Sequence, residues 1–259
     1  MNKLEIVQDE LINGNNFFLR NVSIDNVIFG YHQKELKVLL LRPKGLTKWT
    51  VCGGYIRKTE PIDEAAKRIA RERTGLVNLY LKQFKAFGNP DRTKDAAISI
   101  NLIGETEGIK ADNLAWMLDY FVSLGYYTLT EFDQVKPSGE FNSEECQWWN
   151  IQKLPPLLFD HKLIITEALK SLKLDINHFP IGYELLPEKF TLPEITSLYE
   201  TILEKKLDDR NFAKKLLATG IVTKLNERRN IGPHRSPFLY VFNKEKYDEA
   251  LRYGITLAL

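Results

Sequence analysis

The spacing of hydrophobic residues changes several times along the chain, and each change predicts an element. Alternating apolar positions in Val22–Phe29 and Leu36–Leu41, separated by the polar segment 31–35, predict a β-hairpin. Residues Trp49–Cys52 continue the strand pattern and lead into Gly53 and Gly54. The N-terminal half therefore begins as a sheet, preceded by an arm, residues 1–19, that has no sustained period.

A helix follows the two glycines. Its apolar residues recur at three- and four-residue spacing and are Ile62, Ala65, Ala66, Ile69 and Ala70. Pro61 fits the first turn of this helix, and Gly75 fits a position just past its end.

Further strands are predicted at 76–87, 96–103, 120–130 and 146–151, with an apolar-periodic helix at 157–172. Residues Gly104–Asp119 between two of these strands have the character of an insertion. Strands around one internal helix, followed by a second helix, indicate an α+β domain with a mixed sheet over residues 20–175.

After Pro180 the pattern is typical of a different domain, residues 176–259. Thr191 and Glu194 form a capping box before one amphipathic helix, and Asp208 caps a second helix that runs to about Ala218. Two strands, 221–225 and 238–242, enclose a polar basic loop at 226–236. A helix-turn-helix followed by such a hairpin predicts a winged helix.

Charge supports a nucleic-acid partner for this second domain. The whole chain of 259 residues carries only +2, but residues 205–235 contain nine Lys or Arg against three acidic residues. The residues expected to contact duplex DNA are Arg210, Asn211, Lys214 and Lys215 on the second helix, and Arg228, Arg229, His234 and Arg235 in the wing. Taken singly, each of these residues is better explained as a solvated surface residue; their joint placement on the helix and the wing favours DNA.

Other features exclude some classes of protein. Apolar runs are too short to cross a membrane, and residues 1–5 lack a signal-peptide core, so we expect a cytoplasmic protein. Cys52 and Cys146 fit no metal-binding spacing and are expected to be small buried residues.

One group of residues in the first domain has the spacing of a known catalytic motif. Gly54, Glu60, Arg68 and Glu72, followed by Gly75, resemble the Nudix signature at its correct spacing. The resemblance covers about residues 20–175 and implies an α/β/α sandwich whose motif helix presents glutamates to Mg²⁺ or Mn²⁺ and a pyrophosphate.

Two of the three metal-ligand glutamates implied by that resemblance are replaced here. Ile69 offers no ligand, and Arg73 brings a fixed positive charge to the site. We therefore predict no catalytic residues and no cofactor. Glu72 could hold Mg²⁺ weakly, and Mg²⁺ would be needed only if the protein were a hydrolase after all.

A retained scaffold with lost metal ligands favours binding of an effector. Gly54, Glu60, Arg68 and Glu72 belong to this expected effector site, with Arg68 paired to Glu60 or Glu72. By resemblance, the segment Phe87–Arg92 lies near the pocket mouth, which adds Phe87, Asp91 and Arg92. A plain turn explains Asn89-Pro90-Asp91 equally well. Asp160 is expected to cap the helix that follows it.

The domain order is similar to that of the Nudix-related transcriptional regulators. The resemblance is close at Leu154–His161, at Leu207–Leu216 and at Gly220. It implies a homodimer, a palindromic operator, and an effector of the ADP-ribose or sugar type; the replaced helix is more similar to the arabinose-responsive branch. Two other interpretations are a hydrolase of ADP-ribose or another nucleoside diphosphate derivative, and an adaptor whose wing binds an acidic protein.

Overall fold

The chain folds into two compact units. The computed structural model describes residues 3–43, 45–77, 79–94, 97–132, 144–230, 236–255 and 257. The first unit comprises residues 1–29, 37–129 and 133–168, and the second comprises residues 30–36, 130–132 and 169–259. Within the described residues, no helix combines the length and the apolar character needed to cross a membrane.

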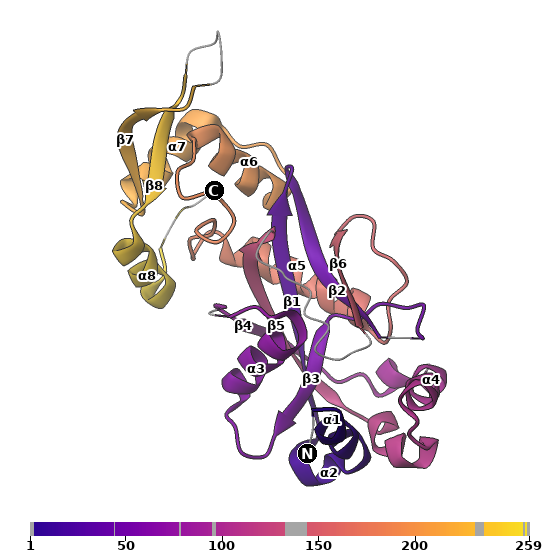
Figure 1. Cartoon of the computed structure of the whole chain (residues 1–259). Coiled ribbons are helices and arrows are strands. Elements are labelled where there is room, and N and C mark those ends of the chain that lie inside the picture. Colours follow the sequence, from indigo (N-terminus) through magenta and orange to yellow (C-terminus); the bar gives the residue numbers. More distant parts are fainter. Residues whose placement is uncertain are drawn as a thin grey trace. The chain divides into compact units, whose positions relative to one another are not determined.

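A sheet forms the frame of the first unit (Figure 1). Its described strands are β1 (Phe18–His32), β2 (Glu35–Pro43), β3 (Cys52–Arg57), β4 (Lys82–Phe87), β5 (Val122–Glu131) and β6 (Glu144–Asn150). The order is β4-β5-β1-β2-β6, with β3 paired antiparallel to β1. The predicted α+β fold with a mixed sheet is confirmed.

The first hairpin is confirmed and is longer than predicted. Strands β1 and β2 meet at Gln33 and Lys34, whose φ angles are 50° and 61°. Two consecutive residues in the left-handed region are characteristic of the tight turn that matches the twist of paired strands. This turn therefore lets both strands continue almost to its tip.

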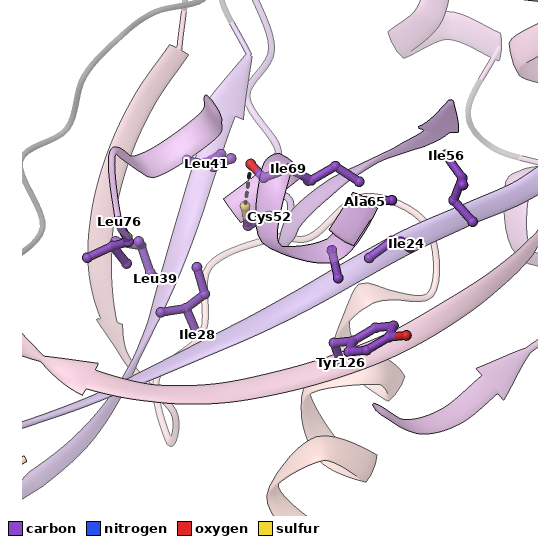
Figure 2. Close-up of a cluster of buried hydrophobic side chains, with 11 residues drawn as sticks. Ile24, Ile28, Leu39, Leu41, Cys52, Ile56, Ala65, Ile69, Leu76 and Tyr126 are labelled. Atoms are coloured by element: carbon purple, nitrogen blue, oxygen red, sulfur yellow. Dashed lines mark hydrogen bonds between the residues drawn. The ribbon is translucent and has the colours of Figure 1, made fainter. Parts of the chain in front are cut away.

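Helix α3 (Ile62–Thr74) packs on one face of the sheet (Figure 2). The buried cluster between helix and sheet consists of Ile24, Ile28, Leu39, Leu41, Cys52, Ile56, Ala65, Ala66, Ile69, Leu76 and Tyr126. The thiol of Cys52 lies 3.8 Å from the carbonyl oxygen of Ile69. Gly75 ends the helix at a φ of 75°, which glycine adopts without steric cost, as the sequence predicted.

Side chains alternate across β1, so neighbouring residues face opposite sides of the sheet. Ile24 and Ile28 face α3, and Asn26 donates a hydrogen bond to the carbonyl oxygen of Ala66 in that helix at 3.0 Å. Asp25 faces the other side, where it meets His161 at the start of α5 (His161–Asp175). The register of β1 thus places a carboxylate inside the protein.

Two predictions about the first unit are wrong. Residues 96–103 were expected to form a strand, but 97–107 form helix α4, and the predicted strand at 76–87 is regular only from Lys82. The apolar residues of α4 fit the spacing of a strand as well as that of a helix. The packing favours the helix, because Ile100 is buried with Ile109 and Leu114, and the partly buried Leu11 packs against them.

Short helices surround α4. The 3₁₀ helices η1 (Pro90–Thr93) and η2 (Ala111–Leu118) flank it, so η2 lies within the segment 104–119 that was expected to be an insertion. The arm is also helical, with α1 (Lys3–Ile12) and α2 (Gly14–Phe17). Its contacts show why: the indole N–H of Trp116 donates to the carbonyl oxygen of Leu11 at 2.9 Å.

The second unit contains the predicted helix-turn-helix and hairpin. Its elements are α6 (Leu192–Leu203), α7 (Asp209–Ala218), β7 (Val222–Arg228), β8 (Phe238–Phe242) and α8 (Lys244–Tyr253). The capping box of Thr191 and Glu194 is present, and Asp208 accepts a hydrogen bond from the backbone N–H of Asn211 at 2.7 Å. Tyr199 and Phe212 pack the two helices together, with ring centroids 5.0 Å apart. Helix α8 was not predicted.

Candidate functional sites

Arg68 organises the motif helix of the first unit. Its guanidinium donates to Glu60 at 2.6 and 2.8 Å, to Glu72 at 2.7 Å, and to the carbonyl oxygen of Tyr55 at 2.8 Å. The side chain is only 12% exposed, and that of Glu60 is 14% exposed. The predicted ion pair is confirmed, and it uses both glutamates.

Ionisation of this pair is favoured by the geometry. Burial opposes the charged form of Glu60, but hydrogen bonds from Arg68 and from the backbone N–H of Arg57 outweigh it and lower the pKa of the carboxyl. Burial likewise opposes the charged form of Arg68, and Glu60 and Glu72 overcome it, which raises the pKa of the guanidinium. Both groups stay charged near neutral pH.

Arg57 extends the network to the N-terminal arm. Its guanidinium lies 3.1 Å from Glu10 of α1 and 3.8 Å from Glu72. Glu72 is therefore close to two arginine side chains. This surrounding leaves little negative charge for a cation, so the structure gives no support to Glu72 as a metal ligand.

The replaced position at Ile69 serves packing and offers no metal ligand. Ile69 directs its carbon side chain at Gly54, where an added Cβ would lie 2.9 Å from the nearest side-chain atom. Gly54 thus serves close packing of strand on helix. Among the described residues, no group of three His, Cys, Asp or Glu side chains is arranged to hold a metal ion.

Arg92 was predicted to face an effector, and the structure places it in a buried charge cluster. Its guanidinium, 4% exposed, lies 2.8 Å from Asp160 and 3.3 Å from Asp25. Ser123 donates to Asp25 at 2.5 Å. The backbone N–H of Val51 donates to Nδ1 of His161 at 3.2 Å, which leaves Nε2 directed at Asp25, 3.5 Å away.

The cluster holds Asp25 ionised. Burial alone would raise the pKa of this carboxyl, but His161, Arg92 and Ser123 together lower it from 3.8 to about 2. Asp160 directly precedes α5, as expected for a cap. Its carboxylate accepts a hydrogen bond from the guanidinium of Arg92. Sequence reasoning missed this cluster because its members come from β1, β5, η1 and α5.

The other two residues of the expected pocket mouth differ in exposure. Phe87 is buried and packs edge-on against Phe84, with centroids 5.8 Å apart. The side chain of Asp91 is 74% exposed, and its backbone N–H donates to Asn89 at 2.9 Å. The turn interpretation of this segment is therefore supported, and Asp91 alone of the two presents its side chain to solvent.

An aromatic cluster next to the motif was also missed. Tyr55 of β3 packs 4.8 Å from Trp116 and 5.5 Å from Phe121, and Trp116 stacks on Phe18 at 6.3 Å. Gly14 lies so close that an added Cβ would be 2.3 Å from the Trp116 ring. The arm and η2 thus meet the strand that carries the motif.

Helix α7 presents the polar residues expected to meet DNA. Arg210, Asn211 and Lys214 are exposed and Lys215 is half-buried, whereas Phe212 and Leu216 point into the core. The exposed residues form a stripe because side chains three and four positions apart share a helix face. This stripe has the chemistry for base edges and phosphates.

The two described arginines of the wing, Arg228 and Arg229, make different contacts. Arg229 forms an ion pair with Glu194 and donates to the carbonyl oxygen of Lys189 at 2.7 Å, so it ties β7 to the start of α6. Arg228 lies over the ring of Phe238 at 3.8 Å, and Lys224 lies 3.6 Å from the same centroid. His234 and Arg235 fall outside the described residues.

Comparison with known proteins agrees with these two units. Residues 182–242 match the family described as NrtR DNA-binding winged helix domain. Over 234 residues the chain is 24% identical to the ADPR responsive transcriptional repressor NtrR of Acinetobacter baylyi, covering 88% of this chain and 84% of the repressor. It is 24% identical over 154 residues to an ADP-ribose pyrophosphatase of Methanocaldococcus jannaschii, covering 58% of this chain and 73% of that enzyme.

The fold agrees with a solved structure of the same architecture. Shewanella oneidensis NrtR complexed with a 27mer DNA has a TM-score of 0.69 and 23% sequence identity, covering 91% of this chain and 98% of that chain. A Nudix-like sheet domain joined to a winged helix defines the class of the Nudix-related transcriptional regulators, and the resemblance to them is confirmed. Residues 182–242 of this chain are similar to the winged helix of the NrtR type.

Proposed function

We propose that this regulator binds an operator through α7 and the wing, and that an ADP-ribose-like nucleotide held by the Nudix-like unit changes its affinity for that operator. The observation that carries the DNA-binding half is the family match over residues 182–242, together with the exposed stripe of Arg210, Asn211 and Lys214 on α7. A charged stripe opposite a buried face is what a recognition helix requires.

The proposed effector follows from relatives and from the motif helix. One relative is an ADPR responsive transcriptional repressor and the other is an ADP-ribose pyrophosphatase, and in this chain Arg68 pairs with Glu60 and Glu72 of the motif. Replacement of two metal ligands by Ile69 and Arg73 supports binding without hydrolysis. The arabinose-type effector stays a prediction that the same experiment tests.

A homodimer on a palindromic operator completes the proposal. Two copies of α7 would enter successive major grooves on one side of the duplex, about 34 Å apart. An effector acts on such a complex only if it favours one arrangement of the two subunits over another. A series of half-site spacings tests this point, since equal affinity at all helical phasings would contradict the symmetric dimer.

The decisive experiment combines two titrations. Calorimetry with ADP-ribose, NAD and arabinose, with a parallel chromatographic assay for AMP and ribose 5-phosphate, is expected to show binding of ADP-ribose without product formation. Fluorescence anisotropy with a duplex selected from a random pool is then expected to show DNA binding that ADP-ribose changes. Metal-dependent cleavage by the wild type would favour the hydrolase, and arabinose binding in place of ADP-ribose would favour the sugar-responsive branch.

A matched pair of variants separates DNA contact from general charge. Arg210→Gln removes one exposed charge from α7, whereas Arg252→Gln removes one exposed charge from α8 of the same unit. Only the α7 variant is expected to lose DNA affinity. Equal loss in both, or no loss in either, would contradict the assignment of α7 as the recognition helix.

A further inference from the structure

The hairpin of β7 and β8 holds two cations against one aromatic ring. The ammonium nitrogen of Lys224 lies 3.6 Å from the ring centroid of Phe238, and the guanidinium carbon of Arg228 lies 3.8 Å from the same centroid. Both cationic side chains are exposed, and Phe238 is half-buried. An aromatic face attracts a cation, so the ring keeps both charges at one place on the surface.

An irregularity in the strand pairing brings the two cations together. Lys224 is paired with Tyr240 and Arg228 with Phe238, so four positions along β7 correspond to two along β8. Without this bulge, the register of the first part of the hairpin would pair Arg228 with Ser236. Bulges redirect side chains in this way. Because paired residues share one face of a hairpin, as do residues two positions apart on a strand, both cations meet the same ring.

The positive charge of the pair is not neutralised by its neighbours. Arg228 donates to the backbone carbonyl oxygen of Ser236 at 2.8 Å, and this oxygen belongs to an uncharged group. Glu227, the acidic residue of β7, is paired with Lys189 at 2.6 Å. In the part of the chain that the structure describes, no carboxylate lies within ion-pair distance of Lys224 or Arg228.

Two cations at one ring repel each other. Their separation is shorter than the Debye length of about 8 Å at physiological ionic strength, so solvent ions screen the repulsion only in part. An anion beside both groups would remove the repulsion, and a phosphate oxygen accepts hydrogen bonds from an ammonium and from a guanidinium. A stacked base does not fit this place, because cations already lie over the ring.

We propose that Lys224 and Arg228 form a phosphate-binding site for duplex DNA on the wing hairpin, and that Phe238 is the residue that positions them. All three residues lie within the segment 182–242 that matches a DNA-binding domain family. Phosphate contacts fix the orientation of a protein on the duplex and carry no sequence information directly. The site thus holds the hairpin on the DNA backbone while α7 contacts base edges. This inference deepens the proposed function and rests on its DNA-binding half.

Single substitutions of the two cations test the site. Lys224→Gln and Arg228→Gln are each expected to weaken binding of duplex DNA about three- to tenfold and to reduce the slope of log affinity against log salt by about one. Anisotropy titrations of the full-length protein at several salt concentrations measure both quantities. Arg252→Gln removes an exposed charge from α8 and is expected to change neither. Equal changes in all three variants, or no change in the two cation variants, would overturn the inference.

A comparison of two DNA sequences separates phosphate contact from base contact. Loss of a phosphate contact weakens binding nearly equally for every sequence. The titrations therefore use the duplex selected from a random pool and a duplex of mixed sequence, and equal fold losses are expected for the two. A loss confined to the selected duplex would show base contact and contradict the phosphate site.

Substitutions of the ring test the positioning role. Phe238→Leu is expected to weaken binding about threefold or more, whereas Phe238→Tyr, which keeps a ring, is expected to stay within about twofold of the wild type. In a protein that already carries Lys224→Gln and Arg228→Gln, Phe238→Leu is expected to have no further effect. A purely structural role would lower affinity in both backgrounds, so equal losses there would reject the positioning role. Thermal unfolding checks each variant, and Phe238→Met replaces Phe238→Leu if the latter is not folded.

The two proposals fail in different ways. If the wild type binds no duplex, the DNA-binding half of the proposed function and the phosphate site are both rejected. If Arg210→Gln weakens DNA binding and the variants at Lys224 and Arg228 do not, α7 stands as the recognition helix and the phosphate site alone is rejected.

Discussion

The motif helix α3 and the helix α7 use the same kinds of charged side chain in opposite ways. On α3, Arg68 turns its guanidinium inward to Glu60 and Glu72 and is 12% exposed. On α7, Arg210 and Lys214 point away from the buried residues Phe212 and Leu216. Arg68 is thus paired within the protein, whereas Arg210 and Lys214 are exposed to solvent.

This difference separates structure from function among residues that look alike in sequence. An arginine enclosed by carboxylates contributes mainly to stability, because removing it leaves buried charge without a partner. An exposed arginine contributes little to stability and is available for phosphate or base contact. Arg92 and Arg229 fall on the structural side of this division, although the sequence analysis included them in the expected effector and DNA sites.

The largest expected effect is that of Arg92→Leu. It leaves Asp25 and Asp160 without their shared cation in a buried site, which costs about 3 to 5 kcal/mol in the free energy of unfolding. Urea unfolding measures the change. Lys94→Leu is the control, since Lys94 lies in the same segment with its side chain 64% exposed, and its effect is expected to be below about 0.5 kcal/mol. Similar losses for both would contradict the buried cluster.

Arg68→Met is expected to have the next largest effect. Loss of its charged hydrogen bonds to two glutamates costs about 2 kcal/mol in unfolding free energy, because one of these carboxylates is mostly buried. Lys67→Met, which removes an exposed pair with Glu64 on the same helix, is expected to change stability by less than about 0.5 kcal/mol. Chemical denaturation compares the two, and a larger loss for Lys67→Met would reverse the assignment.

Acid should weaken the cluster at Asp25 in a defined direction. The pKa of this carboxyl is lowered from 3.8 to about 2 on folding, so the stability it contributes is fully present above pH 3.8 and is lost as the pH falls through about 2. The contribution is on the order of 2 kcal/mol. Carbon-detected NMR titration measures the midpoint, and Ser123→Ala is expected to raise it. A wild-type midpoint near 4 would contradict the cluster.

The smallest expected effect lies on α7. Lys214→Gln is expected to weaken DNA binding several-fold and to reduce the slope of log affinity against log salt by about one, with unfolding free energy unchanged within about 0.5 kcal/mol. Anisotropy titrations at several salt concentrations measure the slope. An unchanged slope, or a loss of stability comparable to that of Arg68→Met, would contradict the outward role of this helix.

The elements with clear local signals were predictable. Helix α3 has a proline before its first residue, Ile62, and a glycine after its last residue, Thr74, and α6 has its capping box. Helix α4 was not predictable, because its apolar run fits two periods and the residues that bury it come from the arm and from η2. The same limit applies to the site: the pairing of Arg68 followed from its spacing to Glu72, whereas the partners of Arg92 lie 67 and 68 positions away.

The sequence by itself determined the order of the domains, the damaged motif and the concentration of positive charge in the C-terminal region, because each depends on residue type and local spacing. Only the tertiary structure decided which charges remain available. Asp25, Arg92 and Asp160 meet because the register of β1 turns one carboxylate inward and the start of α5 brings the other. Burial and pairing depend on contacts between distant segments, and no local pattern encodes them.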